Sequence, residues 1–395
     1  MNVGERPDRQ QLRDSAAAIE DMVRHHLDSY LVQLERAVTD AGGTVHWATG
    51  AAEANLLVDE LVRHERLRAA EVGVTGANFL VAETGTIVMA ESEDNGRICP
   101  ALPETLITVA GIETVVPTWR DLEVFLQLPV RGSTRERVSP YVFTWAGVTN
   151  GDGPRNFHLV LVDDNRTRAP RAKRSATVTN ARETVLARIR NAVSDLPAEQ
   201  RTITAPREYL RRAPGIESGD HDAVVSLFFE RVKHSGAQAH RVDASVLPKA
   251  IASVLHEQGV RSVIAPAGVP EGCLAEWTVD SGNRVVSDDP QLSTAELEAV
   301  DAVITICAAA IADSGSVVLD GGPGQGRRAP TLVPGCHVCV VHAEQIASSV
   351  PEMIGILDPL RPLTWCSGPS ATADIGAIRV QGAHGPRRLV VIIVE

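Results

Sequence analysis

The stretch Ala82-Glu83-Thr84-Gly85-Thr86-Ile87-Val88 returns 230 residues later as Ala312-Asp313-Ser314-Gly315-Ser316-Val317-Val318. Three further pairs follow in the same order: Gly96-Arg97 with Gly326-Arg327, Thr144-Trp145 with Thr364-Trp365, and Gly153-Pro154-Arg155 with Gly385-Pro386-Arg387. A period near 230 residues is far too long for a solenoid repeat. The pattern therefore predicts two copies of one domain.

The two copies differ in length. Gly42 matches Gly236 at an offset of only 194, whereas the later turn glycines are 230 apart, so the first copy lacks about 36 residues. The extra piece of the second copy corresponds roughly to Glu257–Leu292 and includes two predicted strands, Ser262–Ala265 and Arg284–Ser287. A sheet that lacks two strands exposes an edge. We therefore expect the second copy or a partner chain to cover this exposed edge of the first copy.

Length and composition indicate the fold class. A chain of 395 residues fits two domains, and it is 44% hydrophobic but only 4% aromatic. Such a core, rich in Val, Ile, Leu and Ala, is typical of parallel strands and their covering helices. We predict an α/β fold whose mainly parallel sheets carry helices on both faces. The predicted domains are 1–164 and 180–395, joined by a basic linker over 165–179.

Charge and apolar runs exclude several classes of partner. The chain has 38 Lys and Arg against 50 Asp and Glu, a net charge of −12, which argues against nucleic acid or an anionic membrane as the main partner. The most apolar stretches, Ala302–Ala312 and Leu389–Val394, are shorter than the roughly 20 residues of a spanning helix. We expect no membrane span and a cytoplasmic location. The six cysteines do not form a disulfide framework.

The most site-like stretch is Asp320-Gly321-Gly322-Pro323-Gly324-Gln325-Gly326-Arg327-Arg328. Glycines let backbone N–H groups approach an anion, and two arginines are able to complete a carboxylate or phosphate clamp. The predicted ligand-binding residues are Gly321, Gly322, Gly324, Gln325, Gly326, Arg327 and Arg328. The alternative is a tight connection between strands that requires positive φ angles.

A second candidate stretch, Ser367-Gly368-Pro369-Ser370-Ala371-Thr372-Ala373-Asp374, follows the predicted strand Leu363–Cys366. We expect it to open a short helix, whose free N–H groups favour an anion. Ser367, Gly368 and Ser370 are its predicted ligand-binding residues. An ordinary turn capped by Ser or Thr is the alternative.

Metal binding is not expected from Cys336-His337-Val338-Cys339, because the neighbouring residues are strand-like and place the two cysteines on opposite faces. A second CxxC motif is absent from the sequence.

Catalytic groups are weakly indicated. His46 and His240 occupy equivalent places in the repeat, as do the carboxylates of Glu83 and Asp313. A His and a carboxylate form an acid–base pair where the fold joins them, whereas a strand-end histidine and a turn-capping acid are the alternative. The candidate catalytic residues are Asp313, Asp374 and His384.

These motifs resemble the LUD domain of bacterial lactate-utilisation proteins. The half from Asn180 resembles protein C of that family, through Val317–Arg328, Cys336–Val341, Ser367–Ile375 and His384–Leu389. The first half resembles the LUD part of protein B, through Gly73–Phe79, Glu83–Thr86, Asn95–Arg97 and Phe157–Val160.

The resemblance implies a fold like that of the NagB, RpiA and CoA-transferase group, and a role in oxidising L-lactate to pyruvate within an iron–sulfur system. Protein B normally continues into a cysteine-rich, ferredoxin-like region, which this sequence lacks after Arg168. We therefore expect an accessory subunit that binds no cofactor alone and acts with partner subunits that carry the iron–sulfur clusters. Its expected ligand is a small carboxylate or phosphate compound.

Two other functions remain open at this stage. The chain is alternatively a stand-alone enzyme acting on a sugar phosphate or CoA thioester, with Asp313 or Asp374 as its carboxylate. The third reading is a non-catalytic scaffold fusion, suggested by the shortened first domain.

Overall fold

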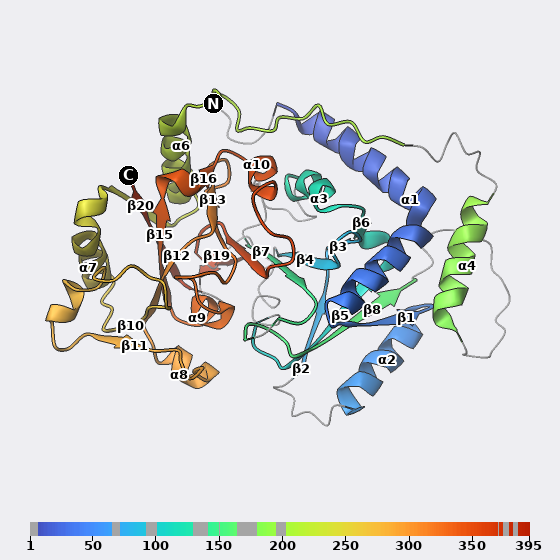
Figure 1. The fold of residues 1–395 in the computed structure, drawn as a ribbon, viewed down its shortest axis with the longest axis horizontal. Coiled ribbons are helices and arrows are strands. Elements are labelled where there is room, and N and C mark those ends of the chain that lie inside the picture. Colours follow the sequence, from blue (N-terminus) through green and yellow to red (C-terminus); the bar gives the residue numbers. More distant parts are fainter. Residues whose placement is uncertain are drawn as a thin grey trace.

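The structure is a computed structural model that describes residues 7–64, 72–91, 101–128, 141–149, 151–163, 180–194, 203–369, 371–373, 379–381 and 386–395. Within these ranges the chain forms two parallel sheets, one in each half, a third sheet that both halves share, and a small two-stranded sheet (Figure 1). The predicted α/β fold with two related halves is confirmed.

The first half contains α1 (Arg9–Asp40), β1 (Thr44–Ala48), α2 (Ala51–His64), β2 (Val72–Gly76), β3 (Phe79–Val81), β4 (Thr86–Glu91), β5 (Thr105–Gly111), β6 (Val115–Val116), α3 (Trp119–Leu126), β7 (Tyr141–Ala146) and β8 (Asn156–Val162). Helix α1 buries one apolar stripe along its whole length, as its helical spacing predicts.

The second half contains α4 (Ala181–Val193), α6 (His221–His234), β9 (Gln238–Val242), α7 (Leu247–Glu257), β10 (Ser262–Ile264), β11 (Arg284–Val286), α8 (Thr294–Glu298), β12 (Ala302–Ile306), β13 (Ala309–Ile311), β14 (Ser316–Leu319), α9 (Arg328–Leu332), β15 (Cys336–His342), β16 (Ile346–Ala347), α10 (Val350–Ile354), β17 (Leu363–Cys366), β18 (Ala371–Ala373), β19 (Arg379–Gln381) and β20 (Arg388–Val394).

The two parallel sheets differ by two strands. The first half has the order β1-β8-β5-β2, and the second has β11-β10-β12-β15-β20-β9. Strands β10 and β11 lie in the segment that has no counterpart in the first copy. Among the described strands, β2 is the last in its sheet, whereas its counterpart β12 is flanked on both sides.

The shared sheet has eight strands in the order β16-β13-β14-β17-β7-β4-β3-β6. Its centre is the antiparallel pair β17 and β7, in which Phe143 lies opposite Thr364 and Thr144 opposite Leu363. Because Thr144 and Thr364 are equivalent in the repeat, these two pairings exchange under a twofold rotation. The halves are thus related by an approximate twofold axis between β7 and β17, which the sequence did not indicate.

An apolar cluster joins the halves beside this axis. Buried side chains of α3 and β7 pack with those of α10 and β17 in one core. The indole Nε1 of Trp119 donates a hydrogen bond to the carbonyl of Ile354 at 3.0 Å, and its side chain is buried. Neither half therefore completes its core without the other.

The repeated Gly of the 82–88 and 312–318 stretches allows a helix to pack against a turn. Gly85 has φ +71° and Gly315 has φ +70°. A Cβ at position 315 would lie 2.6 Å from the carbonyl carbon of Arg231 in α6, and one at position 85 would lie 2.9 Å from that of Ala37 in α1. A larger residue at either position would separate the helix from its sheet.

Residues 180–194 and 203–213 pack over the first half, and the described part after α4 runs above α1 toward α6 (Figure 1). Helix α4 is tied to α1 by an ion pair of Arg182 with Glu35 at 2.8 Å. Further on, Arg211 pairs with the buried Glu123 of α3 at 2.7 Å, and its carbonyl accepts a hydrogen bond from Ser349 of the second half. This segment bridges the two halves.

One local expectation is wrong. The described residues of the Ser367–Asp374 stretch open no helix; Ala371–Ala373 forms β18, which pairs with β19, so backbone pairing overrides the capping signal of the serines. In the described ranges, no helix is both long and apolar enough to cross a bilayer.

Candidate functional site

The second half has a topological switch point between β10 and β12. From β10 the chain moves outward to β11, whereas from β12 it moves the opposite way to β15 and β20. In open α/β sheets, ligands bind in the crevice outside the carboxyl ends of strands at such a point. In the described sheet of the first half, β2, β5 and β8 follow one another in a single direction. The crevice is therefore a feature of the second half.

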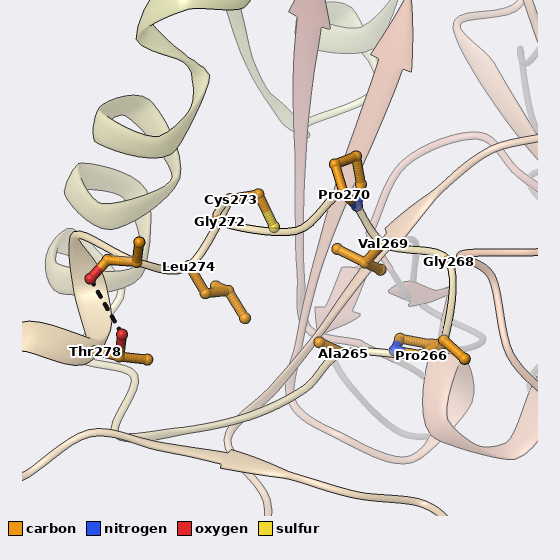
Figure 2. A pocket seen from close by; sticks show the side chains of 11 residues that line it. Ala265, Pro266, Gly268, Val269, Pro270, Gly272, Cys273, Leu274 and Thr278 are labelled. Atoms are coloured by element: carbon orange, nitrogen blue, oxygen red, sulfur yellow. Dashed lines mark hydrogen bonds between the residues drawn. The ribbon is translucent and has the colours of Figure 1, made fainter.

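A cavity of about 400 Å³ lies at this place, immediately after β10. Figure 2 shows its wall, which turns from Ala265 through Pro270 to Thr278. The lining residues are Ala265, Pro266, Ala267, Gly268, Val269, Pro270, Gly272, Cys273, Leu274, Ala275 and Thr278. Cys273 is the only ionisable side chain in this lining. Burial raises the pKa of its thiol further above neutrality, so none of the lining side chains is charged at neutral pH.

The predicted glycine loop packs directly against this wall. The Gly324 amide donates to the carbonyl of Ala267 at 2.7 Å, and the Gly324 carbonyl accepts from the Ile306 amide at 3.0 Å. Gly324 has φ +75°, and a Cβ there would lie 2.7 Å from the Ile306 side chain. Gly326, with φ +69°, leaves room in the same way for Pro266. These contacts give the glycines a packing role; their part in ligand binding stays a prediction.

Polar groups of the glycine loop also form hydrogen bonds with one another, which hold the loop in its conformation. Gln325 is buried, and its Oε1 accepts from the Asp320 amide at 2.6 Å. The Asp320 carboxylate accepts from the Gly322 amide at 3.0 Å and pairs with Arg361 at 2.5 Å. Gly321 has φ +69° and lies beside Asp152 of the first half.

The two arginines of the loop already face carboxylates of this chain. Arg327 donates to both oxygens of Asp288, at 2.7 and 2.8 Å, and to the carbonyl of Leu292 at 2.8 Å. Arg328 is 4% exposed and pairs with Asp152, whose Oδ1 accepts from the Arg328 amide at 2.9 Å. Arg327 thus holds the segment after β11, and Arg328 joins the two halves. Arg328 Nη1 is buried and has no partner among the described residues.

The two predicted ligand-binding stretches lie apart. Ser367 contacts Ser316 at the start of β14, whereas Asp320 and the glycine loop follow the end of that strand. A four-residue strand separates the two by about 13 Å. Gly368 has φ +108°, and its carbonyl accepts from the hydroxyl of Tyr141 in the first half. Ser370 lies outside the described residues.

The candidate acids and bases are not joined by the described contacts. Asp313 is buried in the turn after β13, where its amide donates to the carbonyl of Ser348. The carboxylate of Glu83 accepts from the Trp119 amide at the start of α3. His46 Nε2 lies 3.1 Å from His158 Nδ1, and burial followed by the neighbouring imidazole lowers the pKa of His46. Asp374 and His384 lie outside the described residues.

The cysteines of β15 are distributed as the strand pattern predicts. Cys336 and Cys339 are buried in different apolar clusters. Between them, His337 is fully buried, with Nε2 2.8 Å from Thr305 Oγ1, and burial lowers its pKa to about 4. Across the described ranges, no three His, Cys, Asp or Glu side chains converge as a metal ion requires. The described donor set therefore does not fit an iron–sulfur cluster.

Sequence reasoning missed the wall of the crevice. The signal was present as Ala265-Pro266-Ala267-Gly268-Val269-Pro270-Glu271-Gly272, a run rich in Gly and Pro directly after a predicted strand. It also lies in the segment that only the second copy has. Together these two facts are the signal from which a candidate binding loop was predictable.

Comparison with known proteins settles the family. The family model of the LUD domain matches residues 62–162 and 225–394. The chain belongs to the LUD domain family. The first LUD segment spans β2 to β8, which is the first parallel sheet without β1, and the second spans β9 to β20, which includes the whole second parallel sheet. The resemblance found in the sequence is confirmed.

The relatives of this LUD protein carry two names. Lactate utilization protein C of Deinococcus radiodurans is 46% identical over 175 residues, which are 43% of this chain and 79% of the relative. Lactate utilization protein B 1 of Bacillus mycoides is 46% identical over 99 residues, 25% of this chain and 21% of the relative. Lactate utilization protein B of an Exiguobacterium strain is 36% identical over 148 residues, 36% of this chain and 31% of the relative.

This LUD chain thus spans most of the protein C relative but only a fifth to a third of these B relatives. Among solved structures, a DUF162 family protein from Deinococcus radiodurans is 39% identical. It covers 45% of this chain and 99% of its own length, with a TM-score of 0.38.

Proposed function

We propose that this protein serves lactate utilisation as an accessory subunit that binds a ligand in its second half and docks an iron–sulfur partner with its first. The observation that carries the proposal is the crevice of the second half, which has no counterpart in the described sheet of the first. Relatives named for lactate utilisation supply the biological context. The ligand bears a small carboxylate or phosphate group held near the glycine loop.

Electron transfer is assigned to the partner. Oxidation of L-lactate to pyruvate releases two electrons and two protons, and these need an acceptor. The sequence has six scattered cysteines and no repeated CxxC motif, and the described residues supply no cluster site. The proposed partner therefore carries the iron–sulfur clusters.

The docking role of the first half is supported by exposed apolar side chains on β2 and α2. Val74 in β2 is 48% exposed, whereas the equivalent Ile304 in β12 is fully buried in a cluster with Trp277. Trp277 belongs to the extra segment of the second copy. Leu56 of α2 is also 69% exposed. Val74 is thus exposed at a position that the second half covers with its own chain.

The test is anaerobic purification of the tagged full-length chain from lactate-grown cells of the native host. We expect an iron–sulfur protein to co-elute and lactate to reduce a dye acceptor only in the joint eluate. Val74→Asp is expected to abolish co-elution. Val285→Asp, which changes an equally exposed valine (47%) on the edge strand β11, is the matched control and should retain it.

Lactate oxidation by the chain alone would contradict the accessory role. A partner-free eluate, or equal loss of co-elution in both variants, would contradict the docking face.

A further inference from the structure

The crevice after β10 is too large for lactate alone. A three-carbon hydroxy acid has six non-hydrogen atoms and fills less than about 180 Å³, even if each atom takes the volume of a liquid water molecule. The cavity measures about 400 Å³. Pockets of this size normally hold molecules of cofactor dimensions.

The lining determines which part of a ligand the crevice accepts. Val269, Pro270 and Leu274 supply apolar surface. The hydroxyl of Thr278 already donates to the carbonyl of Ala275 at 3.1 Å (Figure 2), and the Cys273 thiol stays protonated because burial raises its pKa. The lining side chains offer a charged group no ionic partner. The apolar ones favour an uncharged part of the ligand.

The neighbouring loop offers little net charge. Arg327 is neutralised by Asp288, and Arg328 by Asp152. An anionic group on the ligand must consequently remain at the mouth of the crevice, in contact with water and with backbone amides.

We propose that the crevice after β10 binds the uncharged, apolar body of a ligand larger than lactate, whose anionic group stays at the mouth. This inference rests on the proposed function, because it specifies the ligand of the same site. It identifies the bound compound as a cofactor-sized molecule with an apolar portion rather than the three-carbon substrate itself.

The test uses 1-anilinonaphthalene-8-sulfonate, which joins aromatic rings to one sulfonate, in a fluorescence titration of the full-length chain. We expect saturable binding that Ala275→Trp, at the wall of the crevice, weakens at least tenfold. Ala52→Trp, at another exposed alanine, on α2 of the first half, is the matched control and should leave the affinity unchanged. L-lactate, pyruvate and inorganic phosphate at 10 mM, about ten times the upper end of typical KM values, should not displace the probe.

Thr278→Trp, on the same wall, replaces Ala275→Trp if that variant fails to fold, as judged by its melting curve. Unchanged probe affinity in the folded crevice variant would overturn the proposal, as would displacement by lactate or phosphate. Co-elution of the iron–sulfur partner with Ala275→Trp should equal that of wild type. Failure of the crevice proposal and failure of the docking proposal are therefore seen in separate measurements.

Discussion

The pair of Arg328 with Asp152 gives a quantitative test of how the two halves depend on each other. The side chains are 4% and 12% exposed, and they come from opposite halves. Removing one partner of a buried ion pair leaves an uncompensated charge and typically costs about 3–5 kcal/mol. The distance from Arg328 Nε to Asp152 Oδ1 is long, at 3.4 Å. We therefore expect Asp152→Ala to lower the free energy of unfolding by about 3 kcal/mol, the lower limit of this range.

Urea unfolding followed by tryptophan fluorescence measures this cost, because Trp145 and Trp365 lie fully buried in the two central strands and report both halves. Arg328→Met should cost a similar amount. The double variant should cost less than the sum by about 1–3 kcal/mol, since the two groups interact directly. A single transition is expected, because the central sheet runs through both halves.

Glu104→Ala provides the matched control in the same region. Its partner Arg155 is 82% exposed and Glu104 itself 58%, and exposed pairs contribute less than about 1 kcal/mol. If Asp152→Ala costs no more than Glu104→Ala, or if the double variant equals the sum of the singles, the reasoning is refuted.

Three further predictions concern single features. Because burial holds the pKa of His337 at about 4, below the roughly 6.5 of the unfolded chain, its contribution to stability is full above pH 6.5 and is lost as the pH falls toward 4. The free energy of unfolding, measured by urea titration, should fall by about 2 kcal/mol from pH 7 to pH 5. His337→Leu should remove this fall. Gly315→Ala should cost about 3 kcal/mol in urea unfolding, whereas Gly259→Ala, at φ +69° with open space around its Cβ, should cost about 1 kcal/mol; equal costs would exclude the helix clash. Residues 1–168 expressed alone should aggregate, because β7 loses its pairing with β17; a soluble fragment with a cooperative melt would contradict this.

The candidate site shows where local pattern is insufficient. The glycine loop was recognisable because its glycines need positive φ angles, and Gly324 and Gly326 indeed adopt them. Its arginines looked like an anion clamp, yet their carboxylate partners are 39 and 176 residues away along the chain. Sequence spacing gives no measure of such distant pairings, which depend on how the sheets pack.

The sequence by itself determined the duplication, the shortened first copy, the buried strands such as β15 and β20, and the LUD family. These follow from turn glycines, apolar periodicity and repeated motifs, which act over a few neighbouring residues. Only the tertiary structure decided that β7 pairs with β17 across a twofold axis and that the crevice forms at β10. Any exposed strand edge satisfies the same backbone hydrogen bonds, so the choice among edges is made by long-range side-chain packing.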